Sequence, residues 1–152
     1  MTTTDRIERE IVISAPVERV WTLLTEAEHV GRWFGDAGAE IDLKPGGAMT
    51  VRWNEYGSSK ARVVAVEPPE RFSYRWAPFK DLSGDEPADG NSTLVEFTLA
   101  AEGGGTRLRV VESGFDALEG SDADRAKFLA GNTEGWQMET DELREYAEKV
   151  AV

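Results

Sequence analysis

The fold follows from one segment, SDADRAKFLAGNTEGWQMETDELREYAEKV, residues 121–150 of a 152-residue chain. Its apolar and small side chains recur at alternating spacings of four and three, which predicts one buried face of a long C-terminal helix. That face consists of Leu129, Thr133, Trp136, Thr140, Leu143, Ala147 and Val150. The opposite face is acidic, with Glu134, Asp141, Glu145 and Glu148. Ser121 opens the segment as a favourable N-terminal cap.

The chain before this helix alternates mostly with a period of two, which indicates β-strands. Strands are expected over residues 6–13, 40–42, 49–53, 61–67, 72–76, 93–99 and 106–112. Hairpin-length connections make the predicted sheet antiparallel, with about six or seven strands. One face of such a sheet needs a cover, and the C-terminal helix is the long element that can supply it. The predicted fold class is therefore α+β, in one domain over residues 1–152.

Two short helices are expected between the first strand and the rest of the sheet. Ser14 is predicted to cap the first helix, with Pro16 in its first turn. Trp21 and Trp33 are expected to plug one end of the sheet, and His29 to be exposed to solvent.

Composition excludes several classes of function. The 17 basic and 29 acidic residues give a formal net charge of −12, which disfavours nucleic acid and anionic membrane surfaces as partners. The absence of cysteine and the single histidine exclude thiolate metal sites and any site that needs two histidines. No signal-like or membrane-spanning pattern is seen, so a cytoplasmic protein without membrane insertion, metal or cofactor is expected.

The face between sheet and helix is the candidate ligand site. Large rings of the sheet would meet a helix with small residues and two interior glycines, Gly131 and Gly135. Because glycine is unfavourable inside a helix, these two positions indicate either close backbone approach or open space. The candidate ligand contacts are Trp33, Phe34, Trp53, Tyr74, Trp76, Phe97, Glu112, Trp136 and Thr140. The alternative is that all nine are ordinary core residues.

Few side chains in the sequence are candidates for catalysis or metal binding. Alternation places Glu112 on the inner face, where burial would raise its pKa and suit it, with Tyr74, to proton transfer. A location at the strand end, or a bulge at 110–111, would instead turn Glu112 into water. An acidic loop with Asp81, Asp85, Glu86 and Asp89 lacks the order of a calcium loop and is interpreted as a lid or a solvated loop.

Several blocks together resemble one family. They are APVERVWTLLT at 15–25 with Arg32-Trp33-Phe34, DLKPGG at 42–47, VEPPERF at 66–72, Tyr74-Arg75-Trp76, Thr106-Arg107-Leu108, Glu112–Phe115, and Gly135-Trp136 with Leu143. In this order they resemble the activator of heat-shock-protein-90 ATPase homologue family, part of the START-like (SRPBCC) superfamily. The resemblance implies a helix-grip fold, in which a curved antiparallel sheet wraps around a long C-terminal helix. An apolar cavity is expected between the sheet and the helix.

Three functions are consistent with this resemblance. The first is a non-enzymatic protein that binds a lipid-like, polyketide-like or aromatic ligand between sheet and helix. The second is a cyclase or hydrolase that uses the same cavity with Glu112 and Tyr74. The third is a chaperone-cofactor-like interaction domain. Each of these functions is compatible with a monomer or a homodimer. The fold alone does not determine which of the three functions the protein has.

Overall fold

The computed structural model describes residues 6–54, 57–77, 87–88 and 90–149. Within them one antiparallel sheet has the strand order β1-β7-β6-β5-β4-β3-β2. The strands are β1 (Arg6–Ile13), β2 (Ala39–Ile41), β3 (Ala48–Trp53), β4 (Gly57–Glu67), β5 (Arg71–Trp76), β6 (Thr93–Glu102) and β7 (Gly105–Ser113). The helices are α1 (Val17–Thr25), α2 (Ala27–Trp33), the 3-10 helix η1 (Phe115–Ala117) and α3 (Asp122–Lys149).

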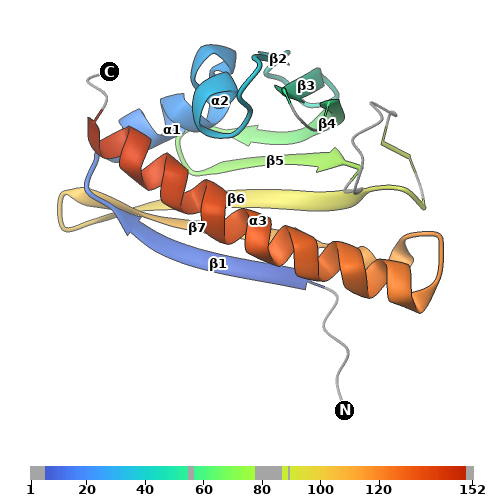
Figure 1. Cartoon of the computed structure of the whole chain (residues 1–152). Coiled ribbons are helices and arrows are strands. Elements are labelled where there is room, and N and C mark those ends of the chain that lie inside the picture. The colour runs from blue at the N-terminus through green and yellow to red at the C-terminus, as the bar shows by residue number, and fades with distance from the viewer. Residues whose placement is uncertain (1–5, 55–56, 78–86, 89, 150–152) are drawn as a thin grey trace.

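Helix α3 crosses one face of the curved sheet, with α1 and α2 beside its C-terminal end (Figure 1). Ser121 caps it as expected, since the Asp124 N–H donates to the Ser121 Oγ at 3.0 Å. Its buried face matches the predicted one at Trp136, Thr140, Leu143 and Ala147, whereas Leu129 and Thr133 are half-buried. Val150 lies outside the described residues.

The alternation of β5 shows how the sheet divides its faces. Phe72, Tyr74 and Trp76 are buried against the helix, while Arg71 and Arg75 are exposed. Strand β4 has a register shift between Val63 and Ala65. Because a bulge moves side chains from one face to the other, simple alternation does not define a single inner face for this strand.

The short helices depart from the sequence expectation in two places. Pro16, not Ser14, is the N-cap of α1, and no side chain caps this end; the Ser14 N–H instead donates to Glu148 at 2.9 Å. His29 was expected to be exposed, but it is half-buried and its Nδ1 lies 2.8 Å from the Tyr146 Oη on α3. Trp33 is buried as expected, and its Nε1 donates to the Leu23 carbonyl at 2.7 Å.

Candidate functional site

Glu112 on β7 lies between sheet and helix and is 0% exposed. Its Oε2 accepts from the Trp76 Nε1 at 2.8 Å and the Thr93 Oγ1 at 2.5 Å. Its Oε1 accepts from the Trp136 Nε1 at 2.8 Å, and the Asn132 Nδ2 lies 3.1 and 3.2 Å from the two oxygens. The register of β7 with β6 is continuous here, so no bulge turns Glu112 outward.

These contacts make Glu112 a joint between three strands and the helix. Burial raises its pKa, while the hydrogen bonds from Thr93, Trp76, Trp136 and Asn132 lower it. A carboxylate has about four acceptor positions, and the protein's own donors occupy them. Glu112 therefore holds α3 on the sheet, and its role as a ligand or proton-transfer group stays a prediction.

Sequence reasoning missed two of the donors, Thr93 and Asn132. Thr93 faces inward by the same alternation as Val95 and Phe97, but a threonine in a strand carries no signal of its own. Asn132 precedes Trp136 by four residues, so both reach the same side of the helix. That spacing is the signal that was available.

An aromatic cluster surrounds the joint. Phe34, directly after α2, stacks on Trp136 with ring centroids 5.5 Å apart and planes at 10°. Trp53 and Trp76 approach Phe34 at 5.4 and 5.5 Å, and Phe97 meets Trp136 edge-on at 5.7 Å. The other members are Trp33 against Phe34, and Tyr74 against Trp76 and Phe97. The fold thus brings the predicted aromatic rings together. Trp53 is half-buried, so the cluster extends to the protein surface at this residue.

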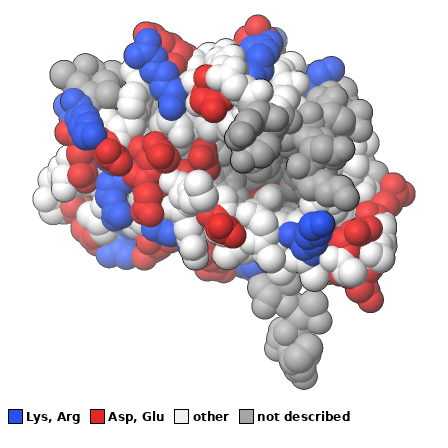
Figure 2. All heavy atoms as spheres, viewed as in Figure 1, with Lys and Arg blue, Asp and Glu red and all other residues white. Residues whose placement is uncertain are grey.

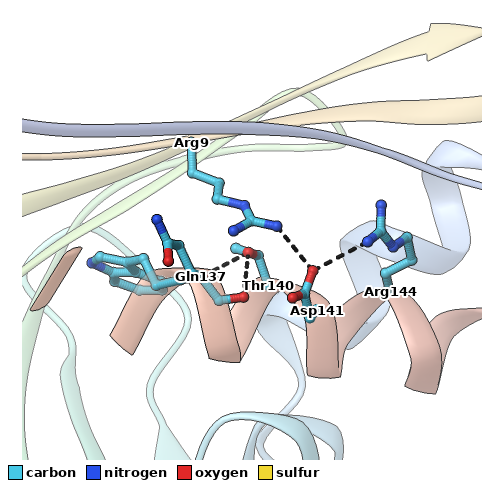
Figure 3. A network of polar contacts seen from close by, with 6 residues as sticks. Arg9, Gln137, Thr140, Asp141 and Arg144 are labelled. Carbon is cyan, nitrogen blue, oxygen red and sulfur yellow. Dashed lines mark hydrogen bonds and ion pairs between the residues drawn. The ribbon is translucent and has the colours of Figure 1, made fainter. Parts of the chain in front are cut away.

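Thr140 is placed differently from the other predicted contacts. It is buried, but its hydroxyl donates to the Trp136 carbonyl at 2.6 Å within the helix. It lies beside Arg9 on the β1 side of α3 (Figure 3). Its polar atom is therefore used by the helix itself.

The two flanks of α3 make different contacts, with β1 on one side and with α2 on the other. On the β1 flank Asp141 pairs with Arg9 at 2.9 Å and with Arg144 at 3.1 Å (Figure 3). Acidic and basic side chains are interspersed over the C-terminal half of the helix (Figure 2). On the other flank Tyr146 contacts His29 of α2. The helix is therefore anchored on both sides near its C-terminal end.

Gly131 and Gly135 lie on the flank away from β1. Among the described residues a Cβ added at either glycine would meet no heavy atom within 4 Å. No described backbone therefore approaches either glycine closely; exposed Gly131 borders solvent, and half-buried Gly135 borders open space. Figure 2 shows the surface hollowed beside the middle of α3.

Two polar atoms at the seam between sheet and helix lack hydrogen-bond partners. The Tyr74 hydroxyl and the Glu139 Oε2 are both buried and unpartnered in the part of the chain that the structure describes. Burial, followed by the charges of Glu112 and Glu139, raises the pKa of Tyr74 well above its usual range. Burial, followed by Glu142 and Asp36, raises the pKa of Glu139 to about 8. Sequence reasoning missed Glu139 because it lies beside the apolar stripe.

Other kinds of site find little support within the described ranges. No group of three or more His, Asp or Glu side chains there is arranged to hold a metal ion. The acidic positions Asp81, Asp85, Glu86 and Asp89, predicted as a lid, lie outside the described residues. Of the helices described, none combines the length and apolarity that crossing a membrane requires.

One family model matches most of the chain. The model described as "Activator of Hsp90 ATPase homolog 1-like protein" matches residues 14–148. The chain belongs to this family. The matched residues include strands β2 to β7 of the sheet and most of α3. The match confirms the resemblance found in the sequence. No protein with a curated description matches the chain.

Solved structures share the fold of this family member. MLL2253 from Mesorhizobium loti has a TM-score of 0.77 at 24% identity, over 97% of this chain and 99% of that one. The Aha1 dimer from Colwellia psychrerythraea has a TM-score of 0.73 at 21% identity, over 96% and 98%. DynU16, from the dynemicin biosynthetic locus, has a TM-score of 0.74 at 24% identity, over 97% of this chain and 48% of that one. These likenesses confirm the helix-grip fold.

Proposed function

We propose that this protein binds an apolar, ring-containing small molecule between the sheet and α3. The observation that carries the proposal is the position of the aromatic cluster. Rings from β3, β5, β6, α3 and the end of α2 meet around Phe34 and Trp136. The cluster includes Trp136, which directly follows half-buried Gly135, and an added Cβ at Gly135 would meet no described atom within 4 Å. Ligand sites are typically apolar concavities with few polar groups, and this seam has that composition.

The two glycines support binding more than packing. Each costs the helix about 1 kcal/mol relative to alanine. Since an alanine methyl would meet no described atom at either position, packing within the chain does not require glycine there. Room for a guest molecule would explain half-buried Gly135, whereas exposed Gly131 borders solvent. The position of DynU16 in a biosynthetic locus is consistent with a small-molecule ligand for this fold.

The other two functions stay predictions. The cyclase or hydrolase alternative relies on Glu112 as a proton-transfer group, and the oxygens of Glu112 already accept from four side chains. An interaction domain has no specific contact surface in its favour here. Monomer or homodimer and a cytoplasmic location are likewise proposals.

Equilibrium dialysis with fluorene, a planar aromatic hydrocarbon, tests the proposal. The wild-type protein is expected to retain fluorene at a ratio near one per chain. Gly135→Leu should fill the open flank and weaken binding at least tenfold. Glu134→Leu adds the same side chain to the exposed face of the same helix and should leave binding unchanged. Equal affinity in all three proteins, or no retention by the wild type, would overturn the proposal.

A further inference from the structure

We propose that Tyr74 and Glu139 form a polar subsite that holds a carbonyl oxygen of the bound ring compound through two donated hydrogen bonds. This inference rests on the proposed function and narrows it to apolar ligands that carry a hydrogen-bond acceptor, such as aryl ketones or quinones. Neither residue belongs to the joint around Glu112, where every described polar atom is paired. Glu112 acts on Tyr74 through its charge, but the Tyr74 hydroxyl forms no hydrogen bond to it or to any other described residue.

The Tyr74 hydroxyl is the first observation. Tyr74 is 1% exposed, and its ring packs between Trp76 and Phe97, which fixes its direction. Its hydroxyl has no hydrogen-bond partner among the described residues. A buried hydroxyl without a partner costs about 1–3 kcal/mol, and native proteins keep few of them. A ligand oxygen would supply the missing partner.

Glu139 is the second, independent observation. Helix geometry puts Gly135 and Glu139 one turn apart on the same flank, opposite the flank of Asp141. The open space at Gly135 therefore leads to Glu139. The buried Oε2 of Glu139 does not bond the Tyr74 hydroxyl, yet its charge acts on that group. Both polar atoms are buried at the seam and lack a partner among the described residues, so each is left for a group that the chain itself does not supply.

The charges around Glu139 decide what it offers. Glu142 on the same helix and Asp36 after α2 act on it as negative charges, and Glu139 in turn acts on Tyr74 of β5. Burial and these carboxylates keep Glu139 protonated at neutral pH, with a pKa of about 8. A protonated carboxyl donates through its O–H, and the phenol of Tyr74 donates as well. Two converging donors select an acceptor such as a carbonyl oxygen and disfavour an anion beside Asp36.

Fluorene and 9-fluorenone form a matched pair of probes, because they share a ring system and differ by the carbonyl. At about pH 6.5 dialysis should show fluorenone bound about tenfold more tightly than fluorene. Tyr74→Phe should reduce this advantage to about threefold or less, measured as the ratio of the two affinities in the same variant. The advantage in the wild type should also fall as pH rises through about 8, where Glu139 ionises. Glu139→Gln, which keeps an N–H donor, should remove that pH dependence.

The outcomes separate this inference from the proposed function. Equal binding of fluorene and fluorenone by the wild type would overturn the subsite and leave the apolar binding function standing. Retention of neither compound would overturn both. Tyr74→Phe loses a hydroxyl that has no partner, so it should unfold at the same temperature as the wild type or above. An unchanged fluorenone advantage in that folded variant would also overturn the subsite.

Discussion

Replacing Glu112 with glutamine should destabilise the protein strongly, although the two side chains have nearly the same shape. The Trp136 indole donates to Oε1 and the Trp76 indole donates to Oε2. A glutamine amide has one oxygen and one NH2 group, and the NH2 group accepts no hydrogen bond. Whichever way the amide turns, one of the two buried indole N–H groups therefore faces another donor.

The size of the effect follows from these contacts. A hydrogen bond to a charged group contributes about 1.5–3 kcal/mol, and an orphaned buried donor costs about 1–3 kcal/mol. Loss of one such bond together with the orphaned indole donor, offset in part because a buried charge disappears, gives a decrease of about 3 kcal/mol in the free energy of unfolding. For a chain of this length that corresponds to a fall of about 6–12 °C in Tm.

Urea denaturation followed by tryptophan fluorescence measures this directly, since two tryptophans bond the replaced group. Glu96→Gln on the outer face of β6 is the matched control and should change stability by less than about 0.5 kcal/mol. If Glu112→Gln unfolds within about 0.5 kcal/mol of the wild type, Glu112 does not join the helix to the sheet. The conclusion that hydrogen bonds to Glu112 hold α3 against the sheet would then be refuted.

Three further predictions concern α3. Gly131→Ala and Gly135→Ala should each raise the free energy of unfolding by about 1 kcal/mol in urea denaturation, because the added methyl meets no described atom; a loss would show that the flank is filled. Glu139 has a folded pKa of about 8, above its ordinary 4.5, so its protonated form favours folding and this stability is lost as pH rises from about 5 to about 9. Relative to Glu139→Gln, the wild type should lose about 2–3 kcal/mol over that range in pH-dependent urea titrations, and parallel curves would show that Glu139 titrates normally. Asp141→Asn weakens the contact with Arg9 at the surface and should lower Tm by about 3 °C or less; a larger fall would mean that this ion pair holds the helix.

The helix and the inner faces of most strands could be predicted because their periods are regular. The 4-3 spacing around Trp136 and the alternation around Tyr74 report burial directly. The inward position of Glu112 followed from the same alternation and is correct. The packing of the helix on the sheet followed from the need to cover one face of the sheet, and the family resemblance implied the same arrangement.

The details that fix the site depend on contacts between distant segments. The donors to Glu112 come from positions 36, 19, 20 and 24 residues away, and no local pattern pairs them. The same holds for the contact of His29 with Tyr146, which is 117 residues away. Glu139 escaped notice because a charged residue beside an apolar stripe is usually solvated. Asp36, on the loop after α2, is one of the distant groups that raise its pKa.

Contacts between bound fluorene and the protein test the central claim most directly. Intermolecular NOEs should connect fluorene protons to the indole of Trp136 and to the rings of Phe34 and Trp53. These residues lie where the aromatic cluster meets the open flank of α3. NOEs confined to exposed Met138, on the outer side of the same helix, would contradict binding between sheet and helix.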